Sequence, residues 1–552
     1  MKNLLKSISG SEWRLVIFLV LVMIIITNLP LVYGWLITPP AKVFTGIHFA
    51  MPNDWFVYYS HLEQAAQGRW LFTDLFASEP HQPVLNTFWL PVGLFGRIFQ
   101  LAPIITFNLF KIFLTPILYF VAYLFLADLF SEVRQRQIGL LMFSFASGAG
   151  IFLTHYFIVY PVNVAVGHFH WPMDLWLPEF SSFSTVSSSP HFIAALTLIL
   201  FIFLLTRLFL KTQKISYSFA AGFSSLLLLS FHPFQTLTIF GVTSIYFVSL
   251  ALINRKIIWA YWRHLLIMVL FSLPAVIYYF YLFQVDFVWR QKSWQNFTPT
   301  TPLGITLVSY GLLPWLAAAG WYFLVKNNYF KNINPENKWF FLTVWLVVQS
   351  LLIYAPVNWQ RRMVMGLNFP LVIFSTIGLF SLNRWLCCRS GKLAQVLFFR
   401  RLIFSVVGCL LVSSSLFLFA VDLLIYRNQS PLAYVDQSVI AAIQWFKTID
   451  SDKIIFNADD RGVNLIPAYA GRRVYVGHGV ETPDYLAKQQ AVTWFFSRNR
   501  SEMTEKSFLL KRQISYVFYG PLEKSLGSYD PESKAYLKKV YANNLVQIYQ
   551  VL

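Results

Sequence analysis

Two short stretches of this chain combine acidic residues with histidine. The first, "MPNDWFVYYSH" (51–61), carries Asp54, and the second, "ASEPHQP" (77–83), carries Glu79 and His81. Both follow the first apolar run of membrane length. A carboxylate can remove a proton from a substrate hydroxyl, and cationic side chains can hold a phosphate. We therefore predict that this loop forms half of an active site for a phosphate-bearing, hydroxyl-rich substrate.

Asp54 is the first candidate for the proton acceptor. It precedes the helical run "WFVYYSHLEQAAQGRW", so it could equally be a helix N-cap. The two roles are compatible, because a carboxylate at a helix start is pinned and still reaches outward. Glu79 and His81 flank a proline, which stiffens the backbone around them. His81 is predicted to bind phosphate, and Glu79 to orient His81 or the acceptor.

Four further candidates for phosphate binding come from later in the chain. His191 opens an apolar run, His232 lies between two runs in "FHPFQ", and Arg361 and Arg362 lie between two others in "PVNWQRRM". Each alone could be an ordinary solvated charge at the membrane surface. Charges at membrane depth are costly, however, and are therefore functional candidates. The set predicts a pocket on the non-cytoplasmic side where these cations meet Asp54.

The composition indicates a protein that crosses the membrane many times. Of 552 residues, 57% are hydrophobic, 18% aromatic and 12% charged, and the mean hydropathy is +0.56. A soluble protein carries about twice that share of charge. The net charge of +19 lies mostly in short loops, which favours anionic lipid headgroups over nucleic acid as its partner.

Metal ligation and disulfide bonding find little support in the sequence. The cysteines are Cys387, Cys388 and Cys409, whose spacing provides neither a disulfide framework nor a metal site. His168 and His170 lie close together in "GHFHWPMD", but no third fixed ligand accompanies them. We expect a site without metal.

Apolar runs predict about eleven membrane spans. The first run is too long for a signal peptide and lacks a small-residue cleavage site, so it is interpreted as a retained span. If the basic loops all face the cytoplasm, as the N-terminus then does, eleven spans alternate consistently. The expected spans are 13–37, 104–130, 138–160, 191–210, 217–231, 234–253, 264–283, 303–325, 339–355, 363–383 and 402–426, and the basic loops are 131–137, 207–214, 254–264, 326–338 and 383–401.

This topology assigns the remaining loops and the tail to the non-cytoplasmic side. The outer loops are 38–103, 161–190 and 284–302, and the tail follows Tyr426. The segment 83–101 is apolar but also contains Pro91, Gly93, Gly96 and Arg97, which weaken it as a span. We expect it to lie on the outer membrane surface or to dip in without crossing.

The tail differs in composition from the rest of the chain. It is polar, and its alternation of helical and strand patterns predicts a small α/β domain over 427–552, after a transmembrane domain over 1–426. The expected strands are 453–458, 473–479, 514–520 and 545–552, and 438–449 is expected to be helical. The stretch "GRRVYVGHGVETPDY" could contact the acceptor or cap the site. Alternatively, His478 and Glu481 only hold a turn, and this alternative is preferred.

The layout resembles the GT-C superfamily of membrane glycosyltransferases, in its bacterial type with a C-terminal extracytoplasmic domain. The residues that carry the resemblance are Asp54 in "PNDWFVYY", the "SEPH" of 78–81 and the "NWQRR" of 358–362. It covers the membrane part in architecture more than in sequence. Many members carry a second acidic residue beside the first, whereas here the neighbour of Asp54 is Asn53, which leaves Glu79 or Asp74 as substitutes for the base.

The resemblance implies a membrane glycosyltransferase, a hexosyl- or pentosyltransferase of the cell envelope, in the plasma (inner) membrane of a bacterium. The donor would be a polyprenyl-phosphate sugar and the acceptor a glycan, lipid or protein. Asp54 would act as general base, with inversion at the sugar and the lipid phosphate leaving. No cofactor, metal or nucleotide is implied. The residues placed to hold the phosphate are His81, His191, His232, Arg361 and Arg362.

Three other classes of function remain open. A transporter or flippase of lipid-linked or small polar substrates should show midplane charges and an internal repeat, and neither is found. A non-catalytic membrane scaffold has no need for histidines and arginines under an acidic loop. A polymerase or ligase of lipid-linked sugars would share the topology and the substrates, so the sequence separates it poorly.

Overall fold

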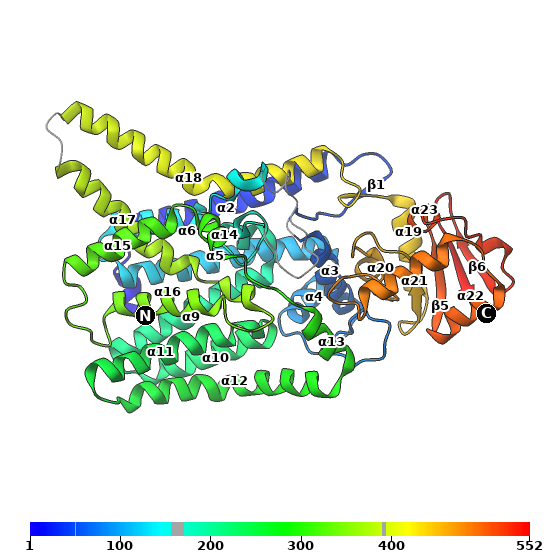
Figure 1. The fold of residues 1–552 in the computed structure, drawn as a ribbon, viewed down its shortest axis with the longest axis horizontal. Helices are drawn as coiled ribbons and strands as arrows, with labels where there is room; N and C mark the ends of the chain where they lie inside the picture. Colours follow the sequence, from blue (N-terminus) through cyan, green and yellow to red (C-terminus); the bar gives the residue numbers. More distant parts are fainter. Residues whose placement is uncertain (50, 156–170, 389–392) are drawn as a thin grey trace. The chain divides into compact units, whose positions relative to one another are not determined.

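The computed structural model describes residues 1–49, 51–155, 171–388 and 393–552 of a mostly helical chain with a small sheet near its C-terminus (Figure 1). His168 and His170 lie outside the described residues. The chain divides by contacts into two compact units. The helical unit comprises Met1–Pro30, Phe110–Tyr278 and Phe297–Asp422, and the loop–tail unit comprises Leu31–Leu109, Tyr279–Asn296 and Leu423–Leu552.

Eight described helical stretches are long and apolar enough to cross a membrane. A ninth results if α14 and α15, which meet at an angle of 81°, are counted as one span. Two further apolar helices are shorter, so each predicted span corresponds to an apolar helix, although length supports only eight or nine. The long stretches are α2 (Gly10–Leu36), α5 (Pro103–Leu129), Val133–Leu153 with α6 (Val133–Phe145), α9 (Pro190–Thr212), Pro233–Asn254 with α11 (Thr236–Asn254), α12 (Trp259–Val285), α17 (Asn368–Cys388) and α18 (Leu393–Arg427). The bent pair is α14 (Leu303–Tyr310) and α15 (Leu313–Lys326), and the shorter helices are α10 (Ile215–Phe231) and α16 (Lys338–Leu352).

The segment 83–101 contains only one short helix, α4 (Trp89–Ile98). Its 10 residues extend roughly 15 Å, about half the hydrocarbon thickness of a bilayer. A helix of this length cannot cross, in agreement with the expectation that this segment is not a span.

Ion pairs gather several of the predicted cytoplasmic loops at one end of the helical unit. Arg207, near the end of α9, lies 3.3 Å from Asp128, near the end of α5, and donates to the carbonyl of Glu336. Arg136, at the start of α6, lies 3.0 Å from Glu12, at the start of α2. The N-terminal segment and the loops 131–137, 207–214 and 326–338 thus share one end, as the alternation of basic loops requires. Which side of the membrane this end faces stays a prediction.

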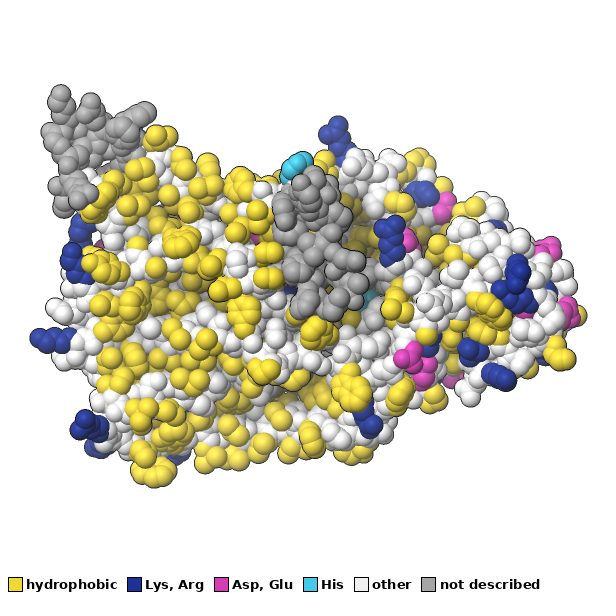
Figure 2. All heavy atoms as spheres, in the orientation of Figure 1, with side chains coloured by type: hydrophobic (Ala, Val, Ile, Leu, Met, Phe, Trp, Pro, Cys, Tyr) yellow, Lys and Arg dark blue, Asp and Glu magenta, His cyan; other side chains and the backbone are white. Residues whose placement is uncertain are grey.

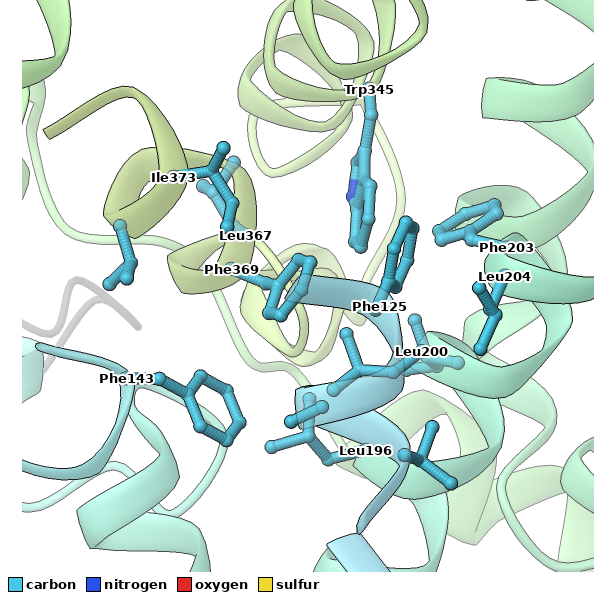
Figure 3. Packing of buried hydrophobic residues seen from close by; sticks show 14 of the residues in the cluster. Phe125, Phe143, Leu196, Leu200, Phe203, Leu204, Trp345, Leu367, Phe369 and Ile373 are labelled. Atoms are coloured by element: carbon cyan, nitrogen blue, oxygen red, sulfur yellow. The ribbon is translucent and has the colours of Figure 1, made fainter. Parts of the chain in front are cut away.

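The core of the helical unit contains large side chains from several helices (Figure 3). Phe203 of α9 and Trp345 of α16 have ring centroids 4.4 Å apart, and Phe125 of α5 and Phe369 of α17 have theirs 4.9 Å apart. All four side chains are at most 1% exposed. Outside this core, hydrophobic side chains cover most of the visible helical surface, whereas acidic side chains are visible mainly over the tail (Figure 2). That distribution suits helices surrounded by lipid.

Helices α15 and α17 approach each other closely through two glycines. A Cβ added at Gly320 would lie 2.0 Å from the carbonyl oxygen of Phe374, and one at Gly378 would lie 2.0 Å from that of Leu316. Small residues allow such backbone contact between helices in a membrane.

The tail forms a five-stranded mixed sheet. The order is β4-β3-β5-β7-β6, parallel in β4-β3-β5 and antiparallel in β5-β7-β6. Four of these strands were predicted, β6 was missed, and β4 ends earlier than expected. The strands are β3 (Ile454–Phe456), β4 (Arg473–Val474), β5 (Ile514–Tyr519), β6 (Leu537–Ala542) and β7 (Gln547–Val551), and the helices are α19 (Gln437–Trp445), α20 (Leu465–Ala470), α21 (Tyr485–Ser497), α22 (Glu502–Lys511) and α23 (Pro521–Ser525).

The first outer loop belongs to the same unit as the tail. Strand β1 (Lys42–Phe44) pairs antiparallel with β2 (Tyr434–Asp436), and both strands were missed in the sequence. Farther along the loop, the amide of Val474 donates to the carbonyl of Leu75 at 2.9 Å. The predicted boundary at 426 stays a prediction, and the grouping of loop with tail is an additional feature of the fold.

We expect Gly320→Ala to destabilise the protein or prevent its folding, because the added methyl group would overlap a carbonyl of α17. The matched control is Gly408→Ala in α18, where a Cβ would meet nothing within 4 Å. Thermal unfolding in detergent should separate the two variants. Equal melting temperatures would contradict the close helix contact.

Candidate active site

Helix α3 (Pro52–Ala66) positions Asp54. Met51 occupies the N-cap position in a left-handed conformation with φ 55°, and Pro52 opens the helix. Asp54 is therefore the third helical residue and not the N-cap, as one interpretation of the sequence allowed. A carboxylate in the first turn is favoured by the positive end of the helix dipole. The buried side chains of Trp55 and Phe56 fix the rotation of the helix.

The carboxylate of Asp54 contacts a histidine from the tail. Nε2 of His478 lies 3.1 Å from Oδ1 of Asp54, with side-chain exposures of 7% and 20%. Nδ1 of His478 accepts the backbone N–H groups of Val480 and Glu481, each at 3.2 Å. Because an amide can only donate, Nδ1 must be unprotonated, and the ring proton of the neutral imidazole lies on Nε2. His478 thus donates its Nε2–H to Asp54.

The turn that carries His478 is bonded to the outer loop. The hydroxyl oxygen of Thr482 accepts from the amides of Gly477 and His478, both at 3.1 Å. The same hydroxyl donates to the carbonyl of Phe76 at 2.8 Å. The interpretation preferred from the sequence was that His478 only holds a turn. Its Nδ1 holds the turn and its Nε2 reaches Asp54.

Glu79 forms an ion pair with Lys488 of α21. Nζ of Lys488 lies 2.6 Å from Oε1 of Glu79 and 2.8 Å from the hydroxyl of Ser78. Burial lowers the pKa of Lys488, although Glu79 acts in the opposite direction. Arg473 donates to the carbonyl of Glu79 at 2.6 Å. Glu79 is therefore held in a fixed position, with about a third of its side chain exposed.

Both ring nitrogens of His81 are used inside the loop. Nδ1 donates to the carbonyl of Glu79 at 2.7 Å, and Nε2 accepts the amide of Asp74 at 2.9 Å. Burial lowers the pKa of His81, and the carboxylates of Asp74 and Asp286 only partly counteract this. The predicted phosphate contact of His81 stays a prediction, and it would require one of these two bonds to open.

Helix α13 (Phe287–Gln295) holds the loop and the turn together. Asp286, its N-cap, accepts the amide of Gln82 at 2.7 Å. Lys292 lies 3.2 Å from Asp74 and also forms an ion pair with Glu481. Asp74, a possible substitute for the base, is therefore bound to a lysine and is 4% exposed.

In the helical unit, the other four predicted residues lie near one another. The rings of His191 and His232 have centroids 6.2 Å apart. Arg362 forms an ion pair of 2.9 Å with Glu179, and the guanidinium of Arg361 lies 4.5 Å from the ring centroid of Trp176. All are buried or nearly so. The cluster joins the start of α9, the end of α10 and the 3₁₀ helix η4 (Gln360–Val364).

Two glutamines fix the arginines in place. Gln349 of α16 donates to the carbonyls of Met363 and Met365 at 2.6 and 2.7 Å and accepts from the indole of Trp345. Gln235 donates to the carbonyl of Arg362 at 2.7 Å. Neither glutamine was singled out in the sequence, because a single amide in an apolar run has no distinctive pattern.

Several buried polar atoms of this cluster make no hydrogen bond within the described part of the chain. They are Oε2 of Glu179, Nε2 of His232 and Oε1 of Gln235. Buried polar groups are normally satisfied, so an unpaired group requires an explanation such as a ligand. These atoms are where the helical unit has unused capacity for hydrogen bonds.

Asp174 is another buried acid of the helical unit. Its Oδ2 accepts the amide of Gly150 at 2.8 Å and the hydroxyl of Ser414. Burial raises the pKa of Asp174 to about 7. A perturbed carboxyl is a functional candidate, but structural networks perturb pKa values as well.

The predicted site residues thus form two groups. Asp54, Glu79 and His81 belong to the loop–tail unit, whereas His191, His232, Arg361 and Arg362 belong to the helical unit. Within each unit the residues lie near one another. The convergence of the two groups on one pocket stays a prediction.

Several solved structures match the fold of this chain. No protein-family model and no curated protein matches. The Archaeoglobus fulgidus oligosaccharyltransferase, tethered to an acceptor peptide with an NVT sequon, matches with a TM-score of 0.54 and 12% identity over 92% of this chain and 69% of its own. ArnT from Cupriavidus metallidurans, bound to undecaprenyl phosphate, matches with a TM-score of 0.50 and 11% identity over 98% of each chain. This chain has the GT-C fold.

The GT-C fold is the architecture that the sequence predicted, with a polytopic helical part and a small C-terminal domain. It does not by itself assign a role to any residue, because the identities are low. Within the described residues, no three side chains of His, Cys, Asp or Glu are grouped to hold a metal ion.

We expect Gln349→Met to destabilise the protein. The change removes the bonds to two buried carbonyls and to the Trp345 indole, and each unsatisfied group costs about 1–3 kcal/mol. The control is Gln444→Met, at an exposed position of α19. Thermal unfolding in detergent checks the difference, and an unchanged melting temperature would show that Gln349 does not hold η4.

We expect the outer loop to open as the pH falls below about 6.5. Burial lowers the pKa of His81 from its ordinary value of 6.5, so its contribution to stability is complete above that pH and is lost on acidification. Protonation of Nε2 would break the bond from Asp74. Hydrogen exchange of the segment 72–84, corrected for intrinsic rates, should increase from pH 7.5 to pH 5.5, and His81→Asn should remove this dependence. Equal protection of the wild-type segment at both pH values would contradict the assignment.

Proposed function

We propose that this chain is a membrane glycosyltransferase that moves a sugar from a polyprenyl-phosphate donor to an acceptor hydroxyl. The observation that carries the proposal is the orientation of Asp54, whose carboxylate is fixed at a helix start by a neutral histidine. The GT-C fold supports it, because the proteins that share the fold include an oligosaccharyltransferase.

The choice of donor is supported by the ligands of two similar structures. The Archaeoglobus fulgidus enzyme was solved with a dolichol-phosphate and ArnT with undecaprenyl phosphate. In this chain, Arg361, Arg362, His191 and His232 would bind the donor phosphate. Guanidinium groups match phosphate geometry, and the unbonded Nε2 of His232 offers a further contact.

In the proposed reaction Asp54 is the general base. The acceptor oxygen attacks the anomeric carbon and forms the new glycosidic bond, while its proton passes to the carboxylate of Asp54. The bond from that carbon to the phosphate oxygen breaks, and the electron pair leaves with the lipid phosphate. A single direct displacement inverts the configuration. The cations of the helical unit would stabilise the charge that develops on the phosphate.

Glu79 would assist this reaction by orienting the acceptor. Its ion pair with Lys488 fixes the carboxylate, and the exposed part of the side chain can accept a hydrogen bond from a hydroxyl. The acceptor itself would be a glycan, lipid or protein.

We place the proposed enzyme in the plasma membrane of a bacterium, with its N-terminus in the cytoplasm and the tail outside. The gathering of basic loops at one end of the helical unit supports this topology. The lipid donor would then be used on the extracytoplasmic face.

A panel of polyprenyl-phosphate sugars, incubated with the purified protein in liposomes together with membrane lipids and glycans as acceptors, tests the proposal. Release of lipid phosphate with transfer of the sugar is the expected result. Binding without turnover would favour a carrier of lipid-linked sugars, and neither binding nor turnover would remove the proposed donor class.

We expect Asp54→Asn to lower kcat by about 100-fold or more while the protein stays folded, because asparagine keeps the shape and can still accept from His478 but cannot take a proton. Arg361→Ala should instead raise the KM for the donor by about 10-fold, the loss of one charge-assisted hydrogen bond. The controls are the exposed positions Asp460→Asn and Arg461→Ala. Full activity of Asp54→Asn would remove Asp54 from the mechanism.

A further inference from the structure

The role of the tail does not follow from the GT-C fold, and the loop–tail unit contains a specific contact that assigns one. We propose that His478 of the tail is a positioning residue for Asp54, and that the tail serves to orient the base. This inference rests on the proposed function. It goes beyond it because it concerns a residue that neither touches the substrate nor belongs to the membrane spans.

The contact has the geometry of a base held by an orienting group. Among the described residues, the side chain of Asp54 makes a hydrogen bond only with His478, and only through its Oδ1. The terminal torsion of an aspartate is broad, so an unrestrained carboxylate samples many orientations. One hydrogen bond to Oδ1 fixes this torsion and leaves Oδ2 to accept the proton of the acceptor hydroxyl.

The tautomer of His478, with its proton on Nε2, allows the ring to donate a hydrogen bond to Asp54. Its Nδ1 is committed to the amides of Val480 and Glu481, so the ring cannot turn over without breaking the turn. During transfer the proton moves from the acceptor oxygen to Oδ2 of Asp54, and it later passes to water. Nε2–H of His478 remains bonded to Oδ1 throughout. The histidine therefore orients the base through a hydrogen bond, as the orienting group does in arrangements of a nucleophile, a base and an orienter.

The turn that presents His478 is anchored from two sides. Thr482 joins it to the outer loop, as described above. From α13, Lys292 pairs with Glu481, Gln295 donates to the carbonyl of Thr482 at 3.1 Å, and Gln291 donates to Asp484 at 2.6 Å. These bonds come from different segments of the chain, so the position of the imidazole is fixed independently of α3. A base held in this way is pre-organised before the substrate binds.

Two substitutions separate positioning of Asp54 from support of the turn. In His478→Gln, the longer amide can place an N–H near the former Nε2 and still donate to Asp54, but it loses the acceptor at Nδ1. In His478→Asn, the shorter amide can place its oxygen near the former Nδ1 and keep the turn, but it cannot reach Asp54. The two variants are close in polarity and differ by one methylene group.

We expect a crossed result. His478→Gln should retain a kcat within about 10-fold of the wild-type value. His478→Asn should lower kcat by about 100-fold and leave the KM for the donor unchanged, because only the orientation of the base is lost. Thermal stability should show the opposite order, with His478→Asn melting at a higher temperature than His478→Gln. If His478→Asn is the more active variant, the histidine only holds the turn and the proposal is overturned.

An infrared measurement tests the contact between His478 and Asp54 without depending on turnover. In protein labelled with ¹³C-aspartate, the infrared difference between wild type and Asp54→Asn identifies the carboxylate stretch of Asp54. This band should shift in His478→Asn and stay near its wild-type position in His478→Gln. A band that is identical in all three proteins overturns the contact. If the band shifts in His478→Asn but the wild-type protein turns over no donor, the proposed function is overturned and the contact stays in place.

Discussion

In the proposed reaction the carboxylate of Asp54 must keep one oxygen directed at the acceptor, and the bond from His478 to the other oxygen would fix that orientation. Much of the loop–tail unit can be understood from this bond. The left-handed Met51 starts α3 so that Asp54 lies in its first turn. The Thr482 hydroxyl and α13 hold the histidine from the other side. The turn that carries His478 is attached to the sheet of the tail, which supports it.

The buried polar and charged groups of the helical unit fall into two sets, one paired and one with unpaired atoms. At the end that carries the basic loops, Asp128 pairs with Arg207 and Glu12 with Arg136, and these pairs join helices to one another. At the end that carries His232, polar atoms are buried without a hydrogen bond within the described residues. Breaking a buried pair costs several kcal/mol, so the first set is expected to be structural. An unsatisfied group has a cost without a structural gain, which is why the second set is the better candidate for binding.

The sequence predicted the fold class well because membrane spans are specified by local composition. Hydropathy located an apolar helix at each expected span, and strand patterns located β3, β5 and β7. Strands β1 and β2 were missed because each has only three residues and finds its partner across most of the chain. The apolar segment around α4 was interpreted correctly because its glycines and proline weakened it as a span.

The candidate site was predictable only in part. Asp54 and Glu79 were singled out because charge is rare in this chain, and the structure shows a bonded partner for each, whereas their catalytic roles stay predictions. Lys488, Gln235 and Gln349 could not have been found, since their roles depend on contacts between distant segments. His478 had a weak signal, a histidine in a glycine-containing turn after a strand, but nothing in the sequence linked it to Asp54.

The pairing of β1 with β2 has a consequence for how the protein matures. The hydroxyl of Thr45, beside β1, bonds to a carbonyl that is 387 residues farther along the chain. During synthesis the edge of β1 therefore stays unpaired until β2, which follows α18, has been made. Assembly of the helices that precede β2 can proceed in the meantime, so the surroundings of the outer loop are completed only after those helices have been made.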